Sequence, residues 1–220
     1  MSEVNIITKL HNSTKRDYQK RVIEEDKVHC SQVAYQFGKE YWDGDRKYGY
    51  GGYKYDGRWS SVAQEFINKY KLTNDSSVLD IGCGKGFLLF EIKQILPGIS
   101  VMGIDISEYA IQNSKSEISH YLKVGDAREI PYKDNQFDLV ISHATLHNLE
   151  IHDVTKALRE ISRVSRKNAW ICVESYRTPE EKVNLLYWQL TCESFFSPTG
   201  WKWIFDNADY QHDYEFMFFE

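Results

Sequence analysis

The segment Val78-Leu79-Asp80-Ile81-Gly82-Cys83-Gly84-Lys85-Gly86 decides the fold of this chain. Its first four residues predict a short buried strand, and its three alternating glycines lead into a helix expected over residues 86–96. Glycines at such a turn permit positive φ angles and let a ligand touch the backbone, and the helix N-terminus supplies free N–H groups. The dinucleotide fingerprint is G-x-G-x-x-G. The G-x-G-x-G spacing found here, with an acid two residues before the first glycine, disfavours a nicotinamide or flavin dinucleotide.

Strand and helix patterns alternate through the rest of the chain. Further strands are expected at 101–104, 121–124, 137–142, 170–173 and 213–219. Further helices are expected at 60–71, 108–118, 153–165, 179–194 and 199–207, with Ser61 and Gln64 as a capping box for 60–71 and Asp153 as the N-cap of 153–165. This order predicts an α/β fold, a Rossmann-like three-layer αβα sandwich with a mainly parallel twisted sheet.

The N-terminal part, residues 1–59, is expected to form a helix and a Tyr/Gly-rich cap that belong to the same unit as the domain over 60–220. Residues 1–13 are predicted to be frayed and residues 14–37 to be helical. The stretch over 38–58, called the cap loop below, contains EYWDGDRKYGYGGYKYDG and is too aromatic for a disordered linker. It is therefore either a lid that closes over a ligand or a static strap on the sheet edge.

Composition narrows the class of protein. The chain has 220 residues and a net charge of -5, without a Lys/Arg-rich block, so a nucleic-acid partner is not expected. No stretch approaches the roughly 20 apolar residues of a membrane span, and the polar N-terminus does not look like a signal peptide, so a cytoplasmic protein with no membrane partner is expected. The four cysteines form no CxxC pair, which predicts neither a disulfide nor a metal site; Cys83 and Cys172 are expected to be buried thiols.

Three more motifs follow the later strands. They are Gly103-Ile104-Asp105-Ile106-Ser107, Gly125-Asp126-Ala127, and Phe137-Asp138-Leu139-Val140-Ile141-Ser142-His143 followed by Leu146-His147-Asn148-Leu149. An acid about 20 residues beyond a glycine loop is placed to accept ribose hydroxyls. Together with the glycine loop, these motifs resemble the class I S-adenosylmethionine-dependent methyltransferase family over roughly residues 60–175.

The resemblance implies S-adenosyl-L-methionine as cofactor and S-adenosyl-L-homocysteine as product, and it assigns a role to each motif. The methionine end would be held by Asp80 and the loop Gly82, Cys83 and Gly84, with His143 nearby at the reactive end. Asp105 would bind the ribose diol and Ile106 would pack on the adenine, while Asp126 and the Ala127 backbone would face the adenine amine.

His143 and His147 are the candidate general bases, since histidine titrates near neutrality. A structural hydrogen bond is the alternative role for each. Tyr48, Tyr50, Tyr53 and Arg58 are candidate substrate or lid residues because tyrosine faces attract a sulfonium cation. Arg46, Lys47, Lys54 and Arg58 could bind an acidic group of the substrate, but most of them are expected to be solvated surface charges. Trp201 and Trp203 are expected to be core residues.

The sequence favours a small-molecule acceptor. The motif of amino-methylating nucleic-acid enzymes after the fourth strand is replaced by Ser142-His143-Ala144-Thr145. We expect methyl transfer to a small molecule, with a hydroxyl of a sugar or another polar metabolite as the favoured acceptor. Three alternatives stay open: a non-catalytic S-adenosylmethionine-binding regulatory module, a methyltransferase that acts on a protein, and a nucleotide oxidoreductase. The oligomeric state is open as well.

Overall fold

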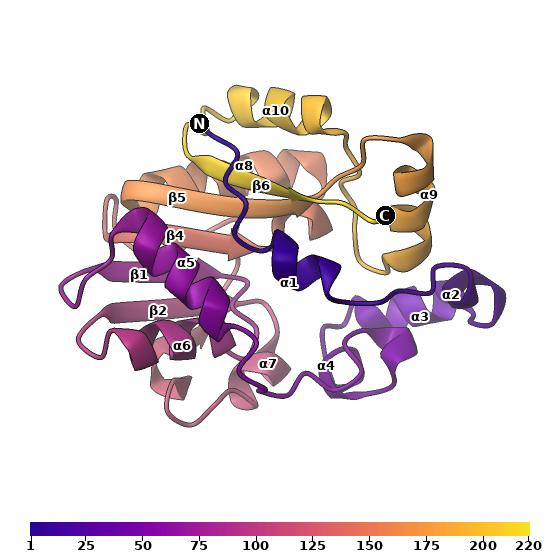
Figure 1. Cartoon of the computed structure of the whole chain (residues 1–220), viewed down its shortest axis with the longest axis horizontal. Helices are drawn as coiled ribbons and strands as arrows, with labels where there is room; N and C mark the ends of the chain where they lie inside the picture. Colours follow the sequence, from indigo (N-terminus) through magenta and orange to yellow (C-terminus); the bar gives the residue numbers. More distant parts are fainter.

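The computed structural model describes all 220 residues and contains one six-stranded sheet in the order β3-β2-β1-β4-β5-β6 (Figure 1). Every neighbouring pair of strands is parallel. The predicted αβα sandwich is therefore confirmed, with a fully parallel sheet. The strands are β1 Ser77–Ile81, β2 Ser100–Asp105, β3 Leu122–Val124, β4 Phe137–His143, β5 Ser165–Glu174 and β6 Asp213–Met217.

Helices cover both faces of this sheet. Successive strand residues point to opposite faces, so on β4 Leu139 and Ile141 join one apolar core while Val140 joins the other. The first core packs against α5 Ser60–Tyr70 and α6 Phe87–Ile95, and the second against α8 Ile151–Val164 and α10 Pro198–Asn207. The remaining helices are α1 Thr8–Asn12, α2 Lys20–Ile23, α3 Lys27–Ala34, α4 Lys39–Asp43, α7 Glu108–Gln112 and α9 Pro179–Trp188, with 3₁₀ turns at Arg46–Tyr48, Ser119–Tyr121 and Leu146–Asn148.

The N-terminus is docked along β6, so the expectation of a frayed end over residues 1–13 is wrong (Figure 1). The Val4 amide donates to the Tyr214 carbonyl at 2.8 Å. The buried Glu215 carboxylate accepts the amides of Ile6 and Thr8 at 2.6 and 2.7 Å. An open edge strand presents unpaired backbone groups, and the N-terminal segment covers this edge of the sheet.

The helix expected over residues 14–37 is broken into α2 and α3. Charged residues of this segment would lie on all sides of a single helix, so the helix would have no continuous apolar stripe to bury. Instead α3 starts at a new cap, where the Asp26 carboxylate accepts the His29 amide at 3.0 Å. The short helices α2, α3 and α4 gather beyond the carboxyl ends of the strands, where α9 also lies (Figure 1).

Two expected helix caps are corrected. Trp59, not Ser61, is the N-cap of α5, and Gln64 donates to Asn68 rather than to the helix start. Glu150 is the N-cap of α8, whereas Asp153 lies in its first turn and accepts a hydrogen bond from Lys156.

Other expectations are confirmed or corrected by burial. Trp201 is fully buried, as expected, but Trp203 is 63% exposed. Cys83 and Cys172 are buried free thiols, as predicted, and no group of His, Cys, Asp and Glu side chains is arranged to hold a metal ion. No helix combines the length and the apolar character needed to cross a membrane.

Candidate functional site

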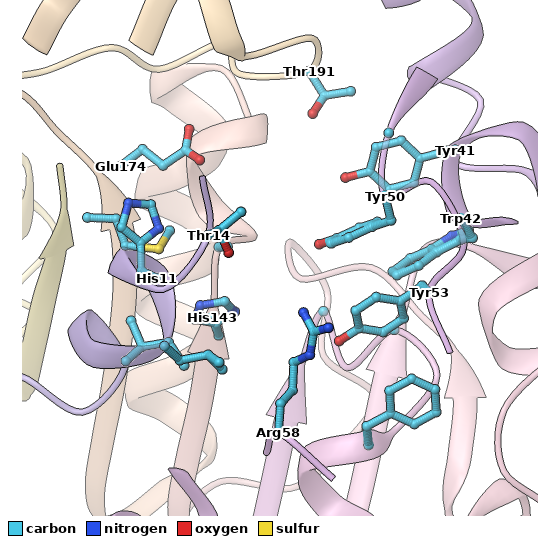
Figure 2. Close-up of a pocket in the computed structure, with 18 of the residues that line it drawn as sticks. His11, Thr14, Tyr41, Trp42, Tyr50, Tyr53, Arg58, His143, Glu174 and Thr191 are labelled. Atoms are coloured by element: carbon cyan, nitrogen blue, oxygen red, sulfur yellow. The ribbon is translucent and has the colours of Figure 1, made fainter. Parts of the chain in front are cut away.

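The candidate site is a cavity of about 440 Å³ at the carboxyl ends of the strands (Figure 2). In parallel α/β sheets, ligands bind outside these strand ends. The floor comes from residues that end or follow β1, β4 and β5, and the opposite wall comes from the cap loop. The sequence-predicted residues that line the cavity are Tyr50, Tyr53, Arg58, Asp80, Gly82, Cys83, Gly84 and His143.

The glycine loop adopts the backbone that its sequence predicts. Gly82 and Gly84 have φ angles of 77° and 54°, which residues with a Cβ rarely adopt. The Gly84 amide donates to the Asp105 carboxylate at 2.7 Å, and the Ser107 amide donates to its other oxygen at 2.8 Å. The ribose acid expected from the sequence is thus fixed beside the loop by two backbone amides.

Asp80 is the acid whose side chain faces the cavity without a hydrogen bond from the protein. It is buried at the end of β1 and lines the cavity floor. Burial, and to a lesser degree the nearby charge of Asp105, raise the pKa of Asp80 to about 7. A cationic group placed beside Asp80 would favour its ionised form.

His143 ends β4 and faces the same cavity. Its Nε2 atom is buried and has no partner in the protein, and its ring lies edge-on to Trp59 with 5.4 Å between the ring centroids. Burial lowers the pKa of His143 to about 4, so the ring is neutral at pH 7. A neutral imidazole with an unsatisfied ring nitrogen can accept a proton or a hydrogen bond from a ligand.

His147, the other candidate general base, does not line the cavity. It is buried outside the cavity lining, and its Nδ1 atom accepts the Glu174 amide at 3.3 Å. Its Nε2 atom is 3.5 Å from a Glu174 carboxyl oxygen. Burial lowers the pKa of His147 to about 3 and raises that of Glu174 to about 8, so both are neutral at pH 7. This geometry is that of a structural contact.

An aromatic wall closes the side of the cavity opposite His143 (Figure 2). Trp42 and Tyr50 are stacked with 5.1 Å between their ring centroids. Tyr53 continues the stack onto Phe87 of α6, at 5.0 Å. Tyr48, the other tyrosine proposed from the sequence, does not line the cavity; it packs against the small cluster around Leu190.

Arg58 reaches into the cavity between His143 and Tyr53 (Figure 2). Its Nε atom donates to both carboxylate oxygens of Asp56, at 2.9 and 2.7 Å. The charge of Arg58 is therefore already balanced by Asp56, two residues before it in the sequence.

The residues expected at the adenine end lie outside the cavity. Ile106 is 55% exposed, and Asp126 is paired with Arg128 at 2.6 Å. Ala127 is buried in the core behind them. Trp42 lies between the expected adenine end and the expected methionine end of the cofactor site. Its indole Nε1 donates to the Ser107 hydroxyl at 2.8 Å, and its ring covers Gly84.

The sequence did not single out Arg16 and Arg21, which lie with Arg46 on the cap side of the cavity. Arg16, Arg21 and Arg46 line it around the ring of Trp188. For Arg46 the sequence left two roles open, binding of an acidic substrate group or a solvated surface charge, and its side chain lines the cavity while remaining exposed; Arg16 and Arg21 carried no local signal. They come together only through the packing of α9 against the segment around α2.

A family described as methyltransferase domain matches residues 72–212, which is more than half of the chain. The chain belongs to this methyltransferase domain family. Within the matched region lie the glycine loop, Asp105, the strand-end His143 and most of the cavity floor.

Curated relatives of this methyltransferase domain differ in their named activities. The demethylmenaquinone methyltransferase of Lactobacillus johnsonii is 30% identical over 166 residues, which cover 70% of this chain and 64% of the relative. The mitochondrial arginine-hydroxylase NDUFAF5 of Mus musculus is 34% identical over 87 residues, or 39% of this chain and 24% of the relative. The chain thus spans less than two thirds of the length of these relatives.

Solved structures share the fold. The YcgJ protein of Bacillus subtilis has a TM-score of 0.54 and 20% identity, with 66% of both chains covered. A chain from the complex of the Haloferax volcanii Trm112 methyltransferase activator with a methyltransferase has a TM-score of 0.56 and 20% identity, covering 89% of this chain and 77% of that one.

Proposed function

We propose that this methyltransferase domain transfers a methyl group from S-adenosylmethionine to a small-molecule acceptor bound in the cavity under the cap loop. One observation carries the proposal: the glycine loop with Asp80 and the aromatic wall of the cap loop open onto the same cavity. Methyl transfer is an in-line displacement, so catalysis requires chiefly that the two reactants be aligned and water excluded. A single cavity between a cofactor loop and an aromatic wall meets both requirements.

The residues of the floor fit the methionine end of this cofactor. Asp80 accepts no hydrogen bond from the protein and can pair with the ammonium group, which would reverse the rise in its pKa. The loop Gly82, Cys83 and Gly84 lines the cavity and would present its backbone to the methionine chain. When bound, S-adenosylmethionine supplies a methyl group on a cationic sulfonium.

The residues beyond Trp42 fit the adenosine end. Each Asp105 oxygen accepts one backbone amide and keeps a lone pair for a ribose hydroxyl. The exposed Ile106 side chain offers an apolar surface to the adenine, and Asp126 with the Ala127 backbone would face its amine. Because Trp42 covers Gly84 between the two ends, we propose that cofactor binding moves this ring.

His143 is the side chain that we propose handles the proton of the acceptor. Its free Nε2 atom faces the cavity, and its lowered pKa keeps it unprotonated at pH 7. A hydroxyl acceptor would donate its hydrogen bond to Nε2 and lose its proton as the new bond forms. Tyr50, Tyr53 and Arg58 would line the acceptor pocket as part of a cap over residues 1–59, with the methyltransferase domain over 60–220.

A labelled-cofactor assay tests this function. The purified chain would be incubated with S-adenosyl-[methyl-³H]methionine and the fractionated contents of the cells that produce it. We expect label in the small-molecule fraction, and none with a His143→Ala variant that still binds S-adenosylhomocysteine. Label in protein alone would point to a protein acceptor, and tight cofactor binding with no label in any fraction would favour the regulatory module.

A further inference from the structure

Three arginines surround one tryptophan on the cap side of the cavity. The guanidinium carbons of Arg16, Arg21 and Arg46 lie 5.7, 4.7 and 5.0 Å from the Trp188 ring centroid. All four residues line the cavity. Arginine stacks readily on an aromatic face, but three like charges on one ring repel one another. We call these three residues the arginine cluster.

No carboxylate balances the arginine cluster. Arg16 donates to the carbonyls of His11 and Thr14 at 3.2 and 3.1 Å, and Arg46 donates to the Gly49 carbonyl. Arg21 reaches only the Arg46 carbonyl, at 3.4 Å. The Nε atoms of Arg16 and Arg21 are buried and have no partner at all. Other arginines of this chain differ in that a carboxylate pairs with them, as Asp56 does with Arg58.

The acids near the arginine cluster do not cancel its charge. Glu25 lies near Arg21 and Arg46, yet no ion pair joins it to either arginine and one of its carboxylate oxygens has no partner. Glu174 lines the cavity, but burial raises its pKa to about 8 and keeps it neutral at pH 7. Burial and the charge of Arg46 also lower the pKa of Arg21. A net positive patch therefore faces the cavity in a chain whose overall charge is -5.

We propose that the arginine cluster binds a phosphate or diphosphate group of the methyl acceptor. The proposal rests on the proposed function, and it names the class of substrate: a phosphorylated small molecule whose acceptor atom faces the floor around His143. Guanidinium forks match phosphate oxygens in pairs. The unpartnered donors would be satisfied by such a group, and its charge would relieve the repulsion among the three arginines. A cavity of about 440 Å³ has the volume of a small-metabolite site.

The specific alternative is that the arginine cluster holds the carboxylate of the cofactor itself. That carboxylate is an anion and would occupy the same cavity. The test must therefore separate an anion bound alongside the cofactor from one that competes with it.

Calorimetry of the full chain with inorganic pyrophosphate provides this test. We expect one binding site whose affinity is unchanged when S-adenosylhomocysteine is present at saturation. Arg46→Gln, which changes an exposed side chain, and Arg21→Gln should each weaken pyrophosphate binding at least about 10-fold, since each removes charge-assisted hydrogen bonds. Arg159→Gln, which removes one exposed positive charge outside the cavity, should leave it unchanged.

Each outcome decides between the two roles. Displacement of pyrophosphate by S-adenosylhomocysteine would overturn the proposal and assign the arginine cluster to the cofactor. Succinate binding as tightly as pyrophosphate would overturn the phosphate assignment. Absence of pyrophosphate binding from a chain that binds S-adenosylhomocysteine would overturn this inference alone, whereas absence of cofactor binding would contradict the proposed function instead.

Discussion

Lys85 of the glycine loop lies 2.7 Å from the Asp43 carboxylate of the cap loop. Both side chains are largely buried, and Asp43 also accepts the Tyr109 hydroxyl at 2.9 Å and the Tyr53 amide at 3.1 Å. Lys85 in turn donates to the Tyr53 carbonyl. This one cluster therefore ties the cap loop to the loop that we propose holds the cofactor.

Removing Asp43 should loosen the cap loop. A hydrogen bond to a charged group contributes about 1.5–3 kcal/mol, so Asp43→Ala should speed amide exchange in the cap loop at least about 10-fold. The amides to follow are those of Tyr50 and Tyr53, which bond to the carbonyls of Tyr41 and Trp42. Hydrogen exchange with mass spectrometry measures the change. Glu40→Ala, an exposed acid of the same short helix, is the matched control, and equal exchange in both variants would show that Asp43 does not hold the loop.

A side chain at Gly84 should displace Trp42. A Cβ built there would lie 2.9 Å from the indole ring, and the φ of 54° adds strain. We expect Gly84→Ala to shift the fluorescence maximum of Trp42 to the red and to weaken S-adenosylhomocysteine binding more than 10-fold. Gly57→Ala is the control, because its φ is also positive, at 78°, but nothing lies within 4 Å of the added atom. Equal effects of the two variants would attribute the loss to strain rather than to Trp42.

Asp105→Asn should be nearly as damaging as Asp105→Ala. Both carboxylate oxygens accept backbone amides, so an amide NH₂ placed there must face either the Gly84 or the Ser107 N–H. An unsatisfied or repelled buried donor costs about 1–3 kcal/mol. We expect both variants to bind S-adenosylhomocysteine at least about 10-fold more weakly, as measured by calorimetry. An Asn variant with parental affinity would mean that this acid does not organise the site.

Glu174 should make the chain less stable as the pH rises. Its folded pKa is about 8 and its ordinary value is 4.5, so between these values the folded state keeps a proton that the unfolded state has lost. Unfolding then releases a proton, and the free energy of unfolding falls with increasing pH. Asp80, with a pKa of about 7, contributes in the same direction.

The Glu174→Gln variant removes this dependence. We expect its melting temperature relative to the parent to rise between pH 5.5 and pH 8.5 by roughly 3–5 °C, the equivalent of at least about 1.4 kcal/mol. Glu150→Gln, at a side chain that is 71% exposed, should show no such change. Parallel melting curves for Glu174→Gln and the parent across this range would mean that Glu174 titrates normally.

Local patterns predicted the sheet and the backbone of the glycine loop because both depend on neighbours in sequence. The strand before Gly82, the glycines and α6 form one continuous segment, and the acid at the end of β2 follows at a readable spacing. The docked N-terminus could not be predicted in this way, because Glu215 meets Ile6 only after the whole sheet has formed. Truncation of residues 1–58 is therefore expected to strip a buried carboxylate of its partners and to unfold the edge of the sheet.

The same distinction holds within the candidate site. His143 was predictable from the end of β4, whereas the arginine cluster joins segments that are remote in sequence and surrounds Trp188 at the end of α9. The partners of His147 come from β5, so its burial against Glu174 had no sequence signal either. Long-range packing decides which polar residues face the cavity and which are buried behind it.

Calorimetric titration of the intact chain with S-adenosylhomocysteine tests whether the glycine loop and Asp105 bind the cofactor. We expect one site per chain with a Kd in the micromolar range, which corresponds to a binding free energy of about −7 to −8 kcal/mol. The Gly84→Ala and Asp105→Asn variants, checked to be folded by circular dichroism, should lose most of this affinity. A folded parent chain that gives no binding heat at millimolar ligand, or that binds equally well in both variants, would contradict the assignment of the glycine loop and Asp105 as a cofactor site.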